Sequence, residues 1–256
     1  MYWRPEMSDI VAERFGNILS VQLNRPAKKN AMTSSMYITM AELLNGAAKD
    51  DQIRVVLWHA AGNSFSAGND IEDFMKNPPA QGESPQAQLI HALINFEKPL
   101  VAAVQGAAIG GGTTMLAHCD FVYAGESAKF QLPFVNLALV PEFGSSYLLP
   151  LRFGYTRAAE LILLGGPFDA SRAAELGLVT QVVPDQSLLA TATETARTLA
   201  AKPAAAVQAS KRLMKRALRE QLEQAVKLEN DVFAERVRSD DAKQAFLAFF
   251  ASRKPA

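Results

Sequence analysis

Two hydrophobic patterns divide this chain of 256 residues, and their order restricts the fold more than any other feature. Through the first two thirds, short apolar runs such as Ile18–Leu23 and Leu100–Val104 alternate with segments of helical periodicity. From about residue 187 the pattern is almost wholly helical. Because strands that alternate with helices are typical of α/β proteins, we expect an α/β core over residues 1–186 and a helical region over residues 187–256.

Individual strands can be placed in the first part. Residues 18–23 alternate apolar and polar side chains, which predicts a strand with one buried face. Residues 100–104 are apolar throughout, which predicts a strand that is buried on both faces. Three further short strands are expected at residues 55–58, 120–124 and 129–132.

Two helices are expected between these strands. The first begins after Thr33 or Ser34, since either hydroxyl can cap a helix N-terminus. Its apolar face is expected to carry Met36, Met40, Leu43, Leu44 and Ala47. The second covers residues 87–96, after an acidic stretch at residues 72–86 whose prolines and glycine predict a mobile surface segment.

The composition excludes several classes of function. The 26 basic and 26 acidic side chains cancel, so the chain lacks the positive charge of a nucleic-acid-binding protein. A single cysteine and three scattered histidines offer no metal-ligand spacing, and we expect no metal site. No apolar run approaches the ~20 residues that span a bilayer, and the N-terminal residues lack the apolar region of a secretory signal. We therefore expect a cytoplasmic protein without membrane contact.

The alternation of strands and helices raises the possibility of a nucleotide site at the glycine triplet of residues 110–112. The triplet lacks the G-x-G-x-x-G spacing, and no acidic residue ends a strand ~20 positions later. The G-x-x-x-x-G-K-[ST] motif is also absent from the sequence. A phosphate-binding P-loop is therefore excluded, and a dinucleotide site is disfavoured.

Three loops that follow expected strands contain the residues best suited to chemistry. They are residues 63–70 (NSFSAGND), 105–112 (QGAAIGGG) and 140–146 (VPEFGSS). Glycines in the first two let a ligand approach the main chain, whose N–H groups can donate to a developing oxyanion. Taken singly, each loop also has an ordinary structural interpretation: a polar turn, a tight helix contact, and an acid in the first turn of a helix. They indicate a site only in combination.

In combination the motifs are far more specific. The order LNRP-x3-NA, FSAGND, KPLVAAVQGAAIGGG and AKFQLPFVNLALVPE resembles the crotonase (enoyl-CoA hydratase/isomerase) superfamily from about residue 10 to the end. The resemblance implies an α/β fold, a crotonase-like spiral of β-β-α units with a helical C-terminal oligomerisation region. It also implies a homotrimer or hexamer that acts on an acyl-CoA thioester. Coenzyme A is then part of the substrate, and no separate cofactor is expected.

The resemblance also implies a role for particular residues. The backbone N–H groups of Asn69 and Gly111 would form an oxyanion hole for the thioester carbonyl, so the side chain of Asn69 is expected to matter little. Loops 27–31 and 66–71 would hold the adenosine and pantetheine parts of coenzyme A. The expected substrate-binding residues are Ala27, Lys29, Ala31, Ser66, Ala67, Gly68, Asp70, Ile71, Gly110 and Phe134. Ala27 stands where hydratases of the family often carry a lysine, so either Lys28 or Lys29 would contact phosphate.

The resemblance also separates reactions within the superfamily. Enoyl-CoA hydratases use two glutamates, and the matching positions here are Thr114 and Phe134, neither of which carries a carboxylate. The acid is Glu142 instead, within LVPEFGSS, which is similar to the Δ3,Δ2-enoyl-CoA isomerases of fatty acid metabolism. One base would move a proton from C2 of a 3-enoyl thioester to C4. An apolar wall at Phe134 would exclude water and raise the pKa of Glu142.

Two alternatives stay open. One is another crotonase-type reaction, such as hydration, thioester hydrolysis or decarboxylation, since one fold supports many chemistries. The other is a non-catalytic CoA-thioester-binding oligomer, for which Glu142 should point to solvent. A basic stripe in the C-terminal region is interpreted as a solvated face, with coenzyme A phosphates as the alternative contact. It consists of Lys211, Arg212, Lys215, Arg216 and Arg219.

Overall fold

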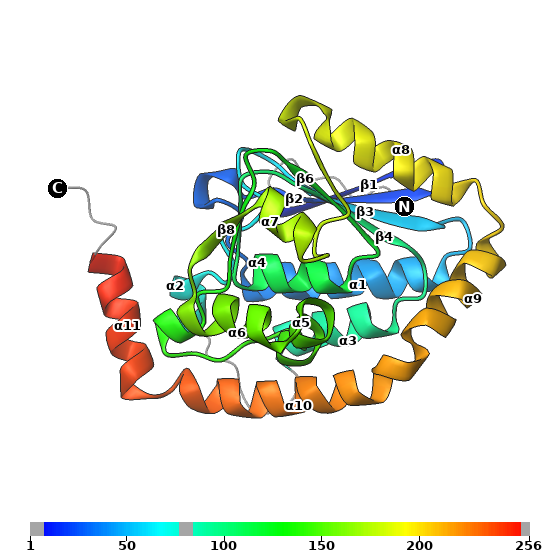
Figure 1. Ribbon diagram of the computed structural model, residues 1–256. Helices are drawn as coiled ribbons and strands as arrows, with labels where there is room; N and C mark the ends of the chain where they lie inside the picture. The colour runs from blue at the N-terminus through cyan, green and yellow to red at the C-terminus, as the bar shows by residue number, and fades with distance from the viewer. Residues whose placement is uncertain (1–7, 77–83, 252–256) are drawn as a thin grey trace.

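Figure 1 shows the computed structural model, which describes residues 8–76 and 84–251. Within these residues, six strands form the main sheet in the order β1-β2-β3-β4-β6-β9, and three form a second sheet in the order β5-β7-β8. The strands are β1 (Ile10–Phe15), β2 (Ile18–Leu23), β3 (Val55–Ala60), β4 (Leu100–Val104), β5 (Ala107–Ile109), β6 (Phe121–Gly125), β7 (Lys129–Gln131), β8 (Pro167–Asp169) and β9 (Gln181–Val183). In the main sheet, β1 pairs antiparallel to β2, and the other neighbours pair parallel.

Helices cover both faces of the main sheet (Figure 1). The α-helices are α1 (Ser34–Lys49), α2 (Ile71–Lys76), α3 (Pro85–Asn95), α4 (Gly111–Thr114), α5 (Ser145–Phe153), α6 (Tyr155–Leu164), α7 (Ala170–Glu175), α8 (Leu188–Ala200), α9 (Ala204–Lys215), α10 (Arg219–Arg236) and α11 (Asp240–Ala251). Short 3-10 turns include η1 (Pro26–Lys28), η2 (Met115–His118) and η3 (Val135–Leu137). None of the described helices is long and apolar enough to cross a membrane.

The central strands are apolar on both faces because each face meets a different layer. On β3, Val55 and Leu57 pack with α8, whereas Val56 and Trp58 belong to the larger core on the side of α1 and α3. Alternate side chains of β4 divide in the same way. The α8 side is lined by alanines and Leu188 at a spacing of four, so the helix approaches the sheet closely. The structure thus confirms the predicted α/β fold of the spiral type.

The helix after Thr33 forms as the sequence predicts, with one correction to its buried face. The Thr33 hydroxyl accepts from the Met36 N–H, so Thr33 is the cap. Leu43 is only partly buried, whereas Tyr37 is fully buried. The face is therefore shifted toward Tyr37, because α1 packs against α3 as well as under the sheet.

Other sequence expectations need correction. The segment expected to be mobile at residues 72–86 begins with α2, a helix that buries Phe74 against the core, and residues 77–83 lie outside the described part. The expected solvated stripe loses Lys211, which is only 4% exposed. Its ammonium donates to Asp120 at 2.6 Å and to the Lys98 carbonyl at 2.7 Å. A partly buried carboxylate partner explains why this lysine leaves the surface.

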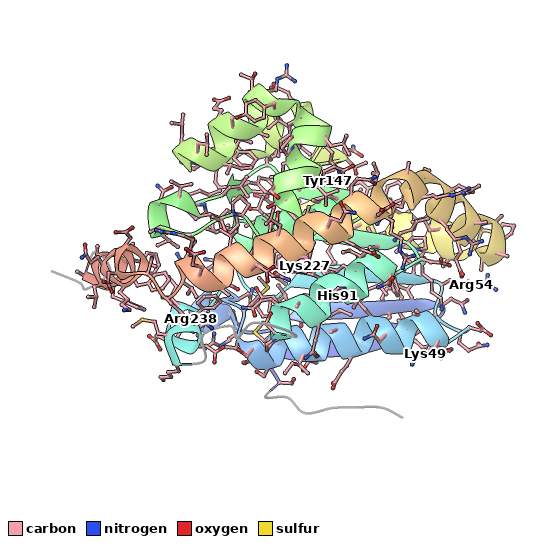
Figure 2. All side chains as sticks on the ribbon, turned by 90° about the horizontal axis from the view of Figure 1, so that it is seen from below. Lys49, Arg54, His91, Tyr147, Lys227 and Arg238 are labelled. Carbon is pink, nitrogen blue, oxygen red and sulfur yellow. The ribbon has the colours of Figure 1, made fainter. Side chains whose placement is uncertain are left out.

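The C-terminal helices wrap around the core and return to it. Figure 2 shows α10 crossing the face formed by α3 and α5, where Lys227, His91 and Tyr147 mark the three helices. The last helix, α11, contacts η3. Leu222, Val226 and Phe233 bury the apolar side of α10. This contact places α10 directly over the turn that precedes α5. Glu142 lies in that turn.

Candidate active site

Two backbone bridges join the loops that follow β2, β3 and β4. The Met32 N–H donates to the Gly68 carbonyl at 2.7 Å, and the Asp70 N–H donates to the Met32 carbonyl at 2.9 Å. A second bridge pairs Ser66 with Ala108 on β5. The carboxyl ends of neighbouring parallel strands meet at one edge, so the three loops converge there.

The backbone amides of Asn69 and Gly111 lie outside these bridges. The Met32 bridge uses the residues on either side of Asn69, and Gly111 begins α4, where the first N–H has no partner within the helix. Neither amide donates to another residue in the described part of the chain. A Cβ on Gly68 would lie 3.7 Å from the Gly111 nitrogen, so the two loops touch. Both donors are therefore free for a ligand.

The carboxylate of Glu142 lies against this junction. A Cβ on Gly111 would lie 2.8 Å from Glu142 Oε1, and the Glu142 side chain is 4% exposed. The Asn69 side-chain amide donates to both carboxylate oxygens, at 3.2 and 3.3 Å. The Tyr37 hydroxyl donates to Asn69 Oδ1 at 2.5 Å. The structure thus brings together Glu142, Asn69 and Gly111, and it shows that the Asn69 side chain contacts the acid.

The surroundings of Glu142 favour its protonated form. Burial raises the pKa of Glu142 to about 7, the hydrogen bond from Asn69 lowers it, and the nearby Glu229 raises it. Burial also raises the pKa of Tyr37 well above its usual value, and Glu142 adds to this effect. A carboxyl with a pKa near neutrality can both accept and return a proton at physiological pH, which suits a general acid–base.

The apolar side chain of Phe134 and the hydroxyl side chain of Thr114 both lie close to Gly110. Phe134 is buried, and its ring lies 3.9 Å from where a Cβ on Gly110 would stand. The Thr114 hydroxyl is buried and donates to the Gly110 carbonyl at 3.3 Å. Gly110 itself donates its N–H to the Gln131 carbonyl. No group of three or more His, Cys, Asp or Glu side chains among the described residues is arranged to hold a metal ion.

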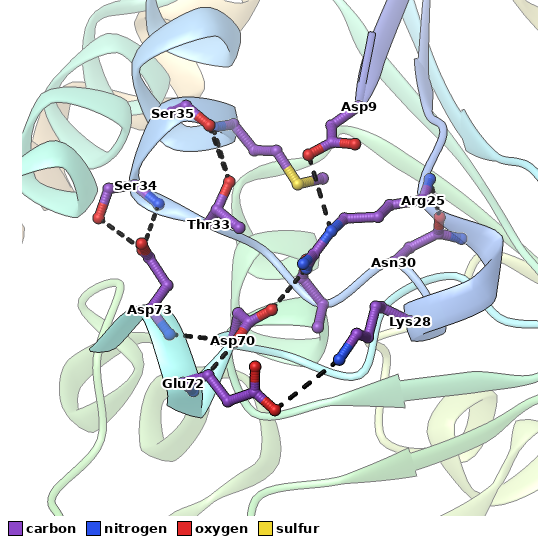
Figure 3. A network of polar contacts seen from close by, with 12 residues as sticks. Asp9, Arg25, Lys28, Asn30, Thr33, Ser34, Ser35, Asp70, Glu72 and Asp73 are labelled. Carbon is purple, nitrogen blue, oxygen red and sulfur yellow. Dashed lines mark hydrogen bonds and ion pairs between the residues drawn. The ribbon is translucent and has the colours of Figure 1, made fainter. Parts of the chain in front are cut away.

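Figure 3 shows a polar network on the other side of the junction, around Arg25 and Asp70. Arg25 contacts Asp70 at 2.5 Å and the Ala31 carbonyl at 3.0 Å. The other Asp70 oxygen accepts from the N–H groups of Glu72 and Asp73 and so caps α2. Burial pushes the pKa of Asp70 upward, but the bonds from Arg25 and the α2 backbone outweigh it and lower the pKa. Both oxygens of Asp70 are thus engaged within the protein.

Buried polar groups hold loops 27–31 and 66–71 together. Asn30 is fully buried and donates to the Ala61 and Ser64 carbonyls. Its carbonyl accepts from the Ser66 hydroxyl, and the Ala67 N–H donates to the Lys29 carbonyl. The Ser66 side chain therefore faces the interior. Ala27 and Lys29 are exposed, whereas Ala31 and Ile71 are half-buried.

The sequence profile described as enoyl-CoA hydratase/isomerase matches residues 13–256. The chain belongs to the enoyl-CoA hydratase/isomerase family. A solved structure of an enoyl-CoA hydratase/isomerase from Pseudoalteromonas atlantica T6c superimposes with a TM-score of 0.91 and 40% sequence identity. The superposition covers 97% of this chain and 99% of that one.

Relatives within the family carry different activities in their names. The chain is 36% identical to the 1,2-epoxyphenylacetyl-CoA isomerase of Escherichia coli, over 93% of this chain and 94% of that protein. It is 36% identical to the enoyl-CoA hydratase EchA19 of Mycobacterium tuberculosis, over 96% and 95%. It is 33% identical to enoyl-CoA delta isomerase 2 of Rattus norvegicus, over 98% of this chain and 65% of that protein. Isomerases and a hydratase thus occur among these relatives, and two of the three are named for an enoyl-CoA.

Three features of this family member were not visible in the sequence pattern. The hydroxyl of Tyr37 reaches Asn69 from α1, and the Asn69 side chain holds Glu142. Glu229 approaches the same turn from α10. For Tyr37 and Glu229 the sequence offers only a weak signal, a polar side chain on an otherwise apolar helix face. Such residues also occur as satisfied core groups.

Proposed function

We propose that the protein is a Δ3,Δ2-enoyl-CoA isomerase that uses Glu142 as its acid–base. The observation that carries the proposal is the buried Glu142 carboxylate, which lies beside Gly111 and is held by Asn69. A purely binding protein has no use for an acid in this place, since burying a carboxyl without a cation is costly. The burial of Glu142 therefore supports an enzyme over a binding module.

The proposed reaction balances with one proton carrier. The Glu142 carboxylate removes a proton from C2 of a 3-enoyl thioester, and the electron pair moves into a dienolate with its charge on the thioester oxygen. The amides of Asn69 and Gly111 donate to that oxygen, as preorganised donors do in oxyanion holes. The dienolate then takes the proton back at C4 from the Glu142 carboxyl. The product is a 2-enoyl thioester, and Glu142 returns to its starting state.

The lack of a carboxylate at Thr114 and Phe134 supports isomerisation over hydration. Adding water across a double bond needs a group that activates the water and one that supplies the second proton. Thr114 is tied to the backbone of α4, and Phe134 is a buried apolar side chain. Phe134 also favours a dry environment, in which a dienolate would be protected from side reactions with water.

The coenzyme would lie along loops 27–31 and 66–71, with Lys29 on its phosphates. Lys28 is within 3.8 Å of Glu72, whereas no carboxylate in the described residues forms an ion pair with Lys29. An exposed lysine without such a partner is better suited to bind phosphate. The Arg25–Asp70 pair would act indirectly, since it keeps these loops in place.

We also propose that the protein works as a homotrimer or hexamer in the cytoplasm. Support for association comes from large apolar side chains that are more than half exposed on α5 and α6. They are Leu151, Tyr155, Leu163 and Leu164. Exposed apolar side chains gathered on neighbouring elements are typical of an interaction surface.

The assay that tests the function offers 3-enoyl-CoA and 2-enoyl-CoA esters separately to the purified protein and identifies the products. The proposal expects rapid conversion of 3-enoyl to 2-enoyl esters and little hydration. Thr114→Ala and Phe134→Leu should keep most of the isomerase activity. A 3-hydroxyacyl ester as the main product, or binding of both esters without turnover, would overturn the proposal.

A further inference from the structure

Glu229 is a second buried carboxylate next to the turn that carries Glu142. It lies on α10, in the helical C-terminal region, and its side chain is 6% exposed. Its two oxygens accept from two backbone groups of the turn: the Gly144 N–H at 2.6 Å and the Ser146 N–H at 2.7 Å. Glu229 on α10 thus binds the backbone that follows Glu142, the proposed acid.

The turn between Glu142 and α5 needs such support because its backbone is unusual. Phe143 and Gly144 have φ angles of +63° and +68°, a region that an aromatic residue rarely adopts. The Phe143 carbonyl accepts from His118 Nε2 at 2.7 Å, which fixes one side of the turn. The Glu229 carboxylate fixes the other side. Strained backbone of this kind persists only where its surroundings hold it.

Side chains of α10 pack closely against the turn. A Cβ on Gly144 would lie 2.3 Å from Leu222 Cδ1 and 3.2 Å from Val226 Cγ2. The positive φ of Gly144 favours glycine, and a larger residue there would also displace Leu222. A shift of α10 would move Glu229 and the backbone of the turn together.

We infer that Glu229 is a positioning residue, which from α10 fixes the backbone that aims Glu142. Its charge also acts on that acid, because Glu229 raises the pKa of Glu142. This inference rests on the proposed isomerase function. It assigns the C-terminal region a direct role in the chemistry of its own chain, in addition to any role in oligomerisation.

The groups around the two carboxyls make the charge effect measurable. Burial raises the pKa of Glu229 to about 7, while bonds from Ser146 and Gly144 lower it. Tyr37 has a pKa well above its usual value through burial, and burial lowers the pKa of His118 to about 3. Both stay neutral between pH 5 and 9. Lys215 on α9 donates to the His118 carbonyl, and burial lowers its pKa to about 8. It therefore titrates above the two carboxyls and contacts the turn only through His118.

The experiment compares Glu229→Gln with Glu235→Gln, an exposed carboxylate on the same helix, and with Glu229→Asp. Glu229→Gln keeps the size but removes the charge and one acceptor. We expect kcat to fall by about tenfold to a hundredfold, as small misplacements of reacting groups do, with KM changed little. The acid limb of the pH profile should move to lower pH. Glu229→Asp keeps the charge, so it should lower kcat with a smaller shift of that limb.

Two measurements are independent of turnover. Carbon-13 NMR of labelled glutamate carboxyls, assigned with Glu142→Gln, should show Glu142 titrating at lower pH in Glu229→Gln. Amide hydrogen exchange at Gly144 and Ser146 should become faster in that variant and stay native in Glu235→Gln. Native kcat, titration and exchange in Glu229→Gln would overturn the inference. If the native protein isomerises no ester, the proposed function fails, while the NMR and exchange results still decide whether Glu229 holds the turn.

Discussion

The two sides of the site treat their carboxylates in opposite ways. On the proposed coenzyme side, Asp70 has Arg25 and the amides of α2 as partners, and its pKa is lowered. On the proposed catalytic side, Glu142 and Glu229 are buried without a cation among their bonded partners, and the pKa of each is raised to about 7. Both arrangements satisfy hydrogen bonds, but only the first stabilises the charged form.

The difference indicates how this chain divides stability and reactivity. A carboxylate with its own cation is a poor base, because its charge is already stabilised, and it is well suited to hold loops. A carboxyl that is buried with amide donors alone gains a proton readily and releases it at neutral pH. We therefore expect changes at Glu142 and Asn69 to alter turnover, and changes at Asp70 to alter stability while turnover per folded molecule stays close to native.

The largest effect is expected from Gly111→Val. A Cβ at this position would lie 2.8 Å from Glu142 Oε1 and 3.2 Å from both Met32 Cε and the Tyr37 hydroxyl. The added side chain would fill the place of the thioester, and isomerisation should become undetectable. Gly46→Ala is the control, because a Cβ there meets nothing within 4 Å. Measurable turnover by Gly111→Val would mean that the thioester binds elsewhere.

Asn69→Ala should have a moderate effect. The sequence alone suggests that only its backbone matters, but its side chain donates to both oxygens of Glu142. Losing a donor to the charged form should raise the pKa of Glu142, so the acid limb of the pH–rate profile should move to higher pH. We expect kcat/KM at neutral pH to fall by about tenfold. Tyr37→Phe, which frees the Asn69 amide, should change the profile in the same direction by less, and unchanged profiles for both variants would refute this coupling.

Glu142→Gln should stabilise the protein at alkaline pH. The pKa of Glu142 is about 7 in the folded chain against an ordinary 4.5, so its stabilising effect is complete below pH 4.5 and lost as the pH rises through 7. The amide does not titrate. In urea unfolding, the free energy of unfolding of the variant should rise relative to that of the native protein from pH 5 to pH 8, by up to about 3 kcal/mol. A pH-independent difference would show that the acid is not desolvated.

Asp70→Asn should give a smaller dependence of stability on pH, in the opposite direction. The folded pKa of Asp70 is lowered, so its stabilising effect is present above the unfolded pKa and lost as the pH falls through the folded one. Because Arg25 would lose its partner, the variant should be less stable by about 2 kcal/mol at pH 7. The difference should shrink in acid. Turnover per folded molecule should stay close to native, and a large loss of kcat would break the division between the two sides.

The sequence predicts those parts of the molecule that depend on local patterns. Strands β2 and β4 have the predicted bounds, and Thr33 caps α1, because alternation and capping are local effects. Loops 63–70 and 105–112 each follow a strand of the main sheet, whereas loop 140–146 follows η3 and meets the other two through Glu142. Short elements such as β8 were missed because three residues carry too little periodicity.

Residues that act across long separations could not be predicted in this way. Lys211 belongs to a basic pattern that is typical of a protein surface. It is buried instead, where it forms an ion pair with Asp120 from a distant segment. Glu229 interrupts the apolar face of Leu222, Val226 and Phe233, but this local pattern does not indicate what the carboxylate contacts. Its role depends on where α10 crosses the chain, which is a tertiary contact. The same holds for Tyr37, whose hydroxyl meets Asn69 only after α1 has packed.

The most direct test of the account is the isomerase rate of Glu142→Gln at neutral pH, with binding of the CoA ester measured on the same sample. The amide keeps the shape and the contact with Asn69 but cannot carry the proton. We expect the rate to fall by about 10²–10⁴-fold, the usual contribution of a positioned general base, with nearly native binding. Near-native turnover by Glu142→Gln would contradict a mechanism in which this carboxyl is the one proton carrier.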